Sequence, residues 1–263
     1  MKKEITALIP VRLGSTRFPR KALASLHGKP MLERMIERIR RSKKIGNIVI
    51  ATTDRPEDQE LQLFSQRLGI ECYQGSSEDV LGRMLSAAQE FGADPCVMML
   101  GDNPLVHSDL IDDVIRLFEE QNLDFAANAT KEYQCLNPSV PQFPVGLRVQ
   151  VIRYEAFKKC EKIATSSHHR EHATSYFTDY PNVFKIGFLQ AQGLWKNLNR
   201  PDLTFAVNFK ENLEMLDEIF GECYKKDHNF SVQKLLEIFD KRPHLVSLMG
   251  NTEGLCSSLQ KSA

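Results

Sequence analysis

The first 130 residues alternate between short apolar runs and segments with helical spacing, and this alternation limits the fold more than any other feature. An apolar run too short for a helix predicts a buried strand, whereas apolar residues recurring every three or four positions predict a helix. Strands that alternate with helices predict right-handed crossovers and a mostly parallel sheet with helices on both faces. We therefore expect a three-layer, Rossmann-like α/β fold. The expected strands are 5–11, 47–52, 70–73, 96–100 and 123–127, and the expected helices are 30–39, 57–68, 78–91 and 109–120.

Beyond residue 130 the pattern is less regular. Residues 131–146 contain three prolines and show no clear period, which predicts a long loop. The remaining strands are expected at 147–152, 183–188 and near 203–207, and the remaining helices at 154–163, 169–179, 211–221 and 231–239.

The composition excludes several classes of protein. Lysine and arginine total 34, as do aspartate and glutamate, so the formal net charge of zero disfavours a nucleic-acid-binding protein. No apolar run approaches the ~20 residues of a membrane helix, and Pro10 and Arg12 interrupt the signal-like start. Six cysteines without a CxxC pair are typical of a reduced protein. We expect a soluble, cytoplasmic protein without a nucleic-acid or membrane partner.

The neutral total conceals an uneven distribution of charge. Residues 1–44 hold 13 lysines and arginines against three acids, whereas residues 45–128 hold four against 16. Part of the basic excess, from Arg34 to Lys44, is expected to be a solvated helix face.

The loop after the first strand, residues 12–21, has four cations, no acid, and a Gly-Ser pair. An open α/β sheet binds its ligands at the carboxyl ends of its strands, where this loop is expected. Backbone amides and guanidinium groups there would hold a polyphosphate. An ordinary solvated basic loop is the alternative. A Walker P-loop is excluded because Gly28-Lys29-Pro30 lacks the upstream glycine and the following Ser or Thr.

Two other loops follow expected strands at the same edge. Asp102 lies in Leu-Gly-Asp-Asn-Pro-Leu directly after a buried strand, which suits a Mg²⁺ ligand but also a plain Asx-turn. Residues 75–83 form a Gly/Ser turn that leads into a helix with Asp79 and Arg83 four residues apart. This segment predicts either a nucleotide contact or a helix cap with one salt bridge.

The sequence His168-His-Arg-Glu-His172 places two imidazoles four residues apart, as in some metal sites. No third ligand follows at a fixed spacing, and Glu171 does not occupy the position of the base in HExxH, so zinc is disfavoured. Contact with a substrate and a plain polar helix face both remain open for this segment.

Seven segments, taken in order, resemble the bacterial cytidylyltransferases, and within them the spore-coat polysaccharide F branch. The relatives of that branch are the CMP-sialic-acid and CMP-Kdo synthetases. The resemblance covers about residues 4–220, and its segments are IPVRLGSTRFPRKAL, GKPML, ATTD, GSSEDVLGR, GDNPL, REHAT and AVNFKENLEML.

The resemblance implies an activity and an organisation. It implies a nucleotide-diphospho-sugar-transferase-like fold with a small dimerisation or substrate subregion, and a homodimer. It implies transfer of CMP from CTP to a sugar or sugar-acid acceptor, with Mg²⁺ and release of pyrophosphate, for surface polysaccharide or glycan synthesis. We expect one domain over 1–250, with a nucleotide-binding half (1–128), an acceptor or dimerisation insertion (129–190), a completing segment (191–250) and a flexible tail (251–263).

Site residues are carried over by matching positions. The expected nucleotide-binding residues are Arg12, Leu13, Gly14, Ser15, Arg17, Lys21, Gly75, Ser76, Asp79, Arg83 and Asp102, with Arg12, Lys21 and Asp102 also catalytic. The Arg-Glu-His motif of the branch falls on Arg170, Glu171 and His172, which are expected to contact the acceptor.

Two motifs depart from the family. The usual Val-Asp-Thr-Pro-Glu-Asp supplies a second metal-binding Asp, but here Asn208 stands in that position, so Mg²⁺ is expected on Asp102 and Asn208. The usual Gly-Leu-Asp-Val-Glu-Val has become Gly146-Leu-Arg148-Val-Gln150-Val, and Arg148 is expected to read an anionic group on the acceptor.

Three alternatives remain. The chain could use another NTP, or it could bind nucleotide without turnover. It could also be a glycosyltransferase, although the usual Asp-x-Asp motif is absent.

Overall fold

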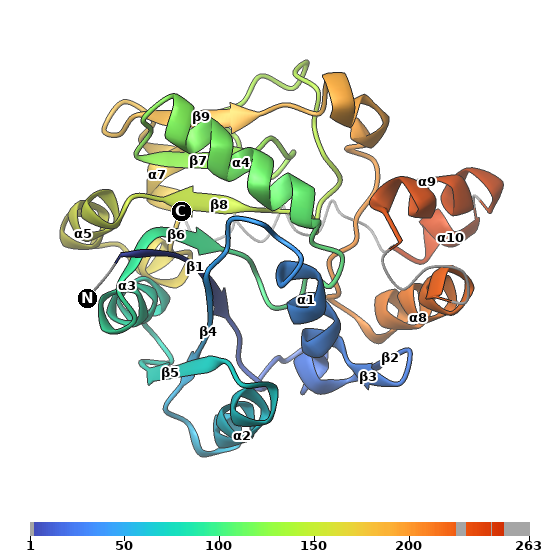
Figure 1. Cartoon of the computed structure of the whole chain (residues 1–263), viewed down its shortest axis with the longest axis horizontal. Helices are drawn as coiled ribbons and strands as arrows, with labels where there is room; N and C mark the ends of the chain where they lie inside the picture. The colour runs from blue at the N-terminus through green and yellow to red at the C-terminus, as the bar shows by residue number, and fades with distance from the viewer. Residues whose placement is uncertain (1–2, 225–229, 243, 250–263) are drawn as a thin grey trace.

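The computed structural model describes residues 3–224, 230–242 and 244–249 and is built on a mixed seven-stranded sheet (Figure 1). The strand order is β5-β4-β1-β6-β8-β7-β9. Only β8 runs antiparallel to its neighbours, β6 and β7, and the other pairs are parallel, which confirms the predicted sheet. The strands are β1 (Glu4–Pro10), β4 (Asn47–Thr53), β5 (Glu71–Gly75), β6 (Ala93–Met98), β7 (Phe125–Asn128), β8 (Gln150–Ile152) and β9 (Ile186–Leu189).

Helices cover both faces of this sheet, so the predicted three layers are present (Figure 1). The helices are α1 (Met31–Ile39), α2 (Gln59–Leu68), α3 (Val80–Glu90), α4 (Ser108–Glu120), α5 (Tyr154–Ile163), α6 (Ser167–Glu171), α7 (Ser175–Asp179), α8 (Lys210–Tyr224), α9 (Val232–Lys241) and α10 (His244–Ser247). The smaller elements are η1 (Lys21–Leu23), η2 (Pro56–Asp58), η3 (Gly193–Leu198) and the hairpin β2 (Ser25–Leu26) and β3 (Lys29–Pro30).

The side chains of the central strand β1 pack into two apolar clusters, one on each face of the sheet. Successive side chains of a strand point to opposite faces. Ala7 and Ile9 accordingly join the apolar cluster that includes α1, α2 and α4, while Leu8 joins the cluster that includes α3, α5 and α7. The sheet is therefore buried on both faces, and its carboxyl edge is left for the loops.

Two predicted elements are wrong in detail. The predicted helix 169–179 is two helices, because the carbonyl of His172 accepts hydrogen bonds from the backbone N–H and the hydroxyl of Ser175 and ends the first of them. The predicted strand near 203–207 forms only an isolated bridge between Val145 and Thr204. The backbone N–H of Val207, at the end of this segment, donates instead to the carbonyl of Asp102, so it does not take part in the hydrogen-bond ladder of a sheet.

Neither a disulfide nor a membrane span appears in the described part of the chain. Cys72, Cys96, Cys135 and Cys160 are free thiols, and no helix there is both long and apolar enough to cross a bilayer. The predicted tail, 251–263, lies outside the described residues.

Candidate active site

The basic loop after β1 is fixed by a hydrogen bond to a buried acid, Asp58, which the sequence alone does not single out. The backbone N–H of the buried Leu13 donates to Oδ1 of buried Asp58 at 2.7 Å. The carbonyl of Leu13 accepts hydrogen bonds from the amides of Ser15 and Arg20, both at 2.9 Å. The loop therefore curls around Leu13, whose amide is engaged by Asp58, while Gly14 and the arginines Arg12 and Arg17 lie exposed.

Lys21 and Asp102 meet at the carboxyl edge of the sheet. Lys21 Nζ lies 2.8 Å from Asp102 Oδ2 and 2.8 Å from the carbonyl oxygen of Val207, and the side chains of Lys21 and Asp102 are 16% and 23% exposed. The segment that carries Asn208 is tied to the same point, because Val207 N–H donates to the carbonyl of Asp102 at 2.9 Å. The structure thus brings together three residues that lie far apart in the sequence.

The second oxygen of Asp102 has no partner. Oδ1 is buried and makes no hydrogen bond, although buried polar atoms are normally satisfied. A carboxylate oxygen without a hydrogen-bond partner is a suitable ligand for Mg²⁺. Asp102, with the amide oxygen of the nearby Asn208, is therefore the part of this edge that could hold a cation.

The second predicted loop is organised around a buried arginine. Arg83 is 4% exposed, and its guanidinium donates to the carbonyl of Ser76. Burial lowers the pKa of Arg83, and the nearby charge of Arg12 lowers it further. Gly75 ends β5 where a Cβ would lie only 2.8 Å from the ring of Tyr73. Arg83 therefore fixes the turn at 75–79 close to the basic loop.

Asp79 and Arg170, predicted in different subsites, are bonded to each other. Asp79 is also the N-cap of α3, because its Oδ1 accepts the N–H of Gly82 at 2.9 Å. Arg170 donates in addition to the carbonyl and the carboxylate of Glu161, at 3.1 and 3.0 Å. The helix cap that the sequence offered as an alternative is present, and its ion-pair partner is Arg170.

The expected acceptor side contains a cluster of enclosed polar groups. Arg148 is 19% exposed and lies 3.3 Å from the carboxylate of Glu132. Burial is the largest single influence and disfavours the charged form, but the charges of Glu132, Tyr133 and Asp102 together outweigh it, so the pKa of Arg148 is raised. Gly146, at φ 89°, lets the chain turn here, since a Cβ would lie 2.3 Å from the nitrogen of Ala206.

The neighbouring Gln150 is buried in a hydrogen-bonded network. Its Nε2 donates to Tyr133 Oη at 3.0 Å and to Thr174 Oγ1 at 2.9 Å. Sequence reasoning missed Tyr133, Thr174 and Glu132, because no local motif marks them.

The other two residues of the Arg-Glu-His motif, Glu171 and His172, are both exposed. Partial desolvation lowers the pKa of His172, and the nearby charge of His168 lowers it further.

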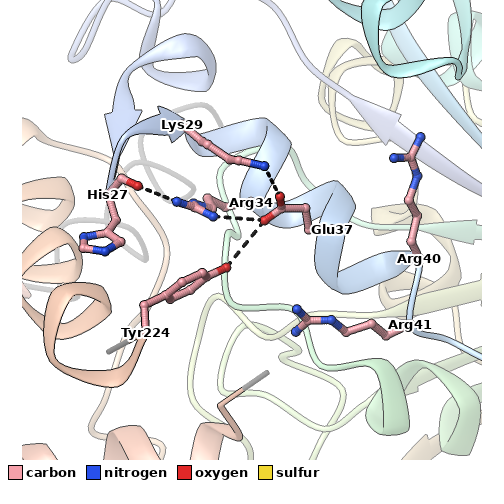
Figure 2. A pocket seen from close by; sticks show the side chains of 7 residues that line it. All are labelled: His27, Lys29, Arg34, Glu37, Arg40, Arg41 and Tyr224. Atoms are coloured by element: carbon pink, nitrogen blue, oxygen red, sulfur yellow. Dashed lines mark hydrogen bonds and ion pairs between the residues drawn. The ribbon is translucent and has the colours of Figure 1, made fainter. Parts of the chain in front are cut away.

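A surface pocket of about 670 Å³ lies away from these residues, between α1, the β2–β3 hairpin and α8 (Figure 2). In it, the carboxylate of Glu37 accepts hydrogen bonds from Lys29, Arg34 and Tyr224, and Arg34 also packs over the ring of Tyr224. The expectation of a solvated basic face from Arg34 to Lys44 is wrong for Arg34 and Arg38, which are 6% and 4% exposed, whereas Arg40 and Lys43 are exposed as expected. The two buried arginines therefore serve packing.

A doubly covered, mostly parallel sheet with a basic loop and a carboxylate at its carboxyl edge defines a nucleotidyltransferase-like α/β fold. The chain belongs to the cytidylyltransferase family, whose sequence model matches residues 6–240.

Individual comparisons agree with this membership. The chain is 26% identical over 245 residues to the spore coat polysaccharide biosynthesis protein SpsF of Bacillus subtilis, covering 91% of this chain and 95% of that protein. It is 39% identical over 111 residues to 3-deoxy-manno-octulosonate cytidylyltransferase of Geobacter sulfurreducens, covering 42% of this chain and 44% of that enzyme. A cytidylyltransferase structure from Leptospira borgpetersenii shares the fold, with a TM-score of 0.82 at 24% identity, over 95% of this chain and 98% of that one.

Proposed function

We propose that the protein transfers CMP from CTP to a hydroxyl of a sugar or sugar-acid acceptor and releases pyrophosphate. The observation that carries this proposal is the Lys21–Asp102 pair, with one buried carboxylate oxygen unpartnered, at the edge of the sheet where the basic loop begins. Family membership and the similarity to SpsF and to a CMP-Kdo-forming enzyme support the same reaction.

The basic loop would bind the triphosphate. The exposed guanidinium groups of Arg12 and Arg17 and the amides of Gly14 and Ser15 are suited to phosphate oxygens. Arg83 and the turn at 75–79 would line the nucleotide beside Arg12. Because the amide of Leu13 already donates to Asp58, Leu13 would shape the loop rather than donate to phosphate.

Asp102 and Asn208 would hold Mg²⁺. A Mg²⁺ ion held by these residues would supply positive charge to offset that of the triphosphate. Since Asn208 contributes a neutral oxygen, the protein supplies a single formal negative charge from these two residues.

The reaction would be a displacement at phosphorus. An acceptor oxygen attacks the α-phosphorus and loses its proton, while the bond between the α-phosphorus and the bridging oxygen to the β-phosphate breaks. Lys21 and Arg12 would stabilise the charge that develops on the phosphates, and Arg17 would bind the departing pyrophosphate. Positioned cations of this kind act mainly by electrostatic stabilisation of the transition state.

The acceptor would carry an anionic group such as a carboxylate. Arg148 is a charged, largely enclosed guanidinium near Asp102, and it forms an ion pair with the partly exposed Glu132. Gln150, Tyr133 and Thr174 fix the polar wall next to it. A 2-keto sugar acid has the carboxylate and the hydroxyls that such a surface would bind.

The test is a matrix of substrates. The full chain is incubated with Mg²⁺, with each of CTP, UTP, ATP and GTP, and with a panel of 2-keto sugar acids, and pyrophosphate release is measured. We expect release with CTP and at least one acid. Equal rates with all four nucleotides would contradict the assignment of CTP, and tight CTP binding in calorimetry without turnover on any acceptor would indicate a nucleotide-binding protein instead. The homodimer and the cytoplasmic location remain predictions.

A further inference from the structure

Three potential metal ligands converge where α6 and α7 face each other. His169 Nε2 lies 3.0 Å from Asp179 Oδ2, and His168 Nε2 lies 3.8 Å from the same oxygen. The ligand atoms of all three residues lie within 4.8 Å of one another, and no other group of three His, Cys, Asp or Glu side chains in the described part of the chain meets that condition.

Two of the three distances are close to those of a tetrahedral ion. Zinc binds histidine nitrogen at about 2.0–2.1 Å and carboxylate oxygen at about 2.0–2.2 Å, so tetrahedral ligand atoms lie about 3.3–3.6 Å apart. The two separations from Asp179, 3.0 and 3.8 Å, lie on either side of that range. The two imidazole nitrogens lie within 4.8 Å of each other, so a bound ion would draw the histidine rings together.

The surroundings of His169 prepare one nitrogen for a metal. Ser166 Oγ lies 2.6 Å from its Nδ1, and Asp179 Oδ2 lies 3.0 Å from its Nε2. A cation that replaced the proton between Nε2 and Asp179 would leave Nδ1–H to donate to Ser166. Ligating histidines normally make such a second hydrogen bond. The rings of Tyr176 and Tyr180 lie 5.0 and 5.8 Å from the imidazole, and the His169 side chain is only 11% exposed.

We propose that His168, His169 and Asp179 form a binding site for Zn²⁺, with the fourth position open to water. Two imidazoles and one carboxylate are donors that zinc accepts. Zinc is disfavoured from the sequence because only the spacing of His168 and His172 is considered there; the cluster instead joins the neighbouring His168 and His169 to a carboxylate from the following helix.

The ion would cross-link two helices that are weak alone. α6 and α7 have five residues each, and isolated helices of that length are not stable in water. Because α6 also carries Arg170, which binds Asp79 at the start of α3, the ion would hold this ion pair in place as well. This site is independent of the proposed CTP reaction, so either proposal can fail without the other.

The test uses the full chain after treatment with a chelator, without nucleotide or Mg²⁺. Zn²⁺ is titrated by calorimetry, Co²⁺ by visible absorption, and the melting temperature is recorded with and without Zn²⁺. The variants are His168→Ala, His169→Ala and Asp179→Asn; the last keeps the shape of an exposed side chain and so separates loss of a ligand from loss of the fold. The matched controls are His27→Asn and Glu155→Gln, which lie outside the cluster.

We expect one Zn²⁺ per chain, a rise in melting temperature on binding, and at least about tenfold weaker binding in each cluster variant. The controls should bind as the unmodified chain does. The proposal is overturned if the unmodified chain binds Zn²⁺ no more tightly than Asp179→Asn. It is equally overturned if His27→Asn weakens binding as much as His169→Ala.

Discussion

The two sides of the candidate site are built on opposite principles. On the proposed nucleotide side, Arg12 and Arg17 are exposed, and Arg17 lies over the ring of Phe209. On the proposed acceptor side, Arg148 and Gln150 are enclosed and already bonded to other side chains. On the proposed function, the difference teaches that the first side would bind through charge, which many polyanions satisfy, whereas the second would bind through a fixed arrangement of polar groups, which few acceptors match.

The largest expected effect is on the charge-based side. Lys21→Ala should lower turnover by at least about 10²-fold, because it removes a positioned cation from the developing phosphate charge. Pyrophosphate release measures the rate, and thermal unfolding shows whether the fold persists. Lys210→Ala, at an exposed lysine that pairs with Glu214 on α8, is the control and should retain full activity. An unchanged rate in Lys21→Ala would remove the core of the proposed mechanism.

The next effect separates the two sides directly. Arg148→Asp should raise the acceptor KM at least about tenfold, the magnitude of a lost charged hydrogen bond, and leave the CTP KM within about twofold. Initial rates at varied acceptor and CTP concentrations measure both constants, and Arg116→Asp, at an exposed arginine on α4, is the control. If neither constant changes, Arg148 has a structural role only.

A stability measurement sharpens the same contrast. Gln150→Leu should lower the free energy of unfolding by about 1–3 kcal/mol, because it leaves the buried hydroxyls of Tyr133 and Thr174 without that donor. Arg17→Ala should change it by no more than about 0.5 kcal/mol, as for most exposed positions. Urea unfolding followed by circular dichroism compares the two variants. Equal losses would show that the exposed loop is also a structural element.

The smallest expected effect is that of salt concentration on the two KM values. Raising the ionic strength from about 0.05 to 0.5 M shortens the screening length well below 10 Å, so the CTP KM should rise several-fold. The acceptor KM should change less, because Arg148 is enclosed. Kinetics at saturating Mg²⁺ across a salt series provide the measurement, and a steeper salt dependence of the acceptor KM would reverse the comparison.

The same contrast explains what the sequence could predict. The basic loop is continuous in the chain, and Asp102 directly follows an apolar strand, so their placement at one edge follows from the strand–helix alternation. Asp58, Glu132 and Thr174 are marked by no such pattern. Asp58 reaches Leu13 because β4 pairs with β1. Glu132 and Thr174 join the site because β8 enters the sheet antiparallel between β6 and β7, and an alternation of consecutive elements does not specify that insertion.

Local competition between hydrogen bonds accounts for the remaining errors. The sequence predicts one helix through 169–179. The carbonyl of His172 instead accepts hydrogen bonds from the hydroxyl and the amide of Ser175, and the first helix ends there. Arg34 and Arg38 were expected in water because they are charged. They can be buried because backbone carbonyls, among them those of Leu26 and Val106, accept hydrogen bonds from their guanidinium groups.

The ion pair between Lys21 and Asp102 has a consequence for the order of binding. Without ligands, each of these groups is the other's counter-ion. A cation arriving alone has to displace the ammonium from its carboxylate, and a triphosphate arriving alone has to draw the same ammonium away from an acid. When both arrive together, the carboxylate and the ammonium exchange partners and neither charge is left uncompensated. On the proposed function, nucleotide and metal should therefore bind with positive cooperativity, each strengthening the binding of the other.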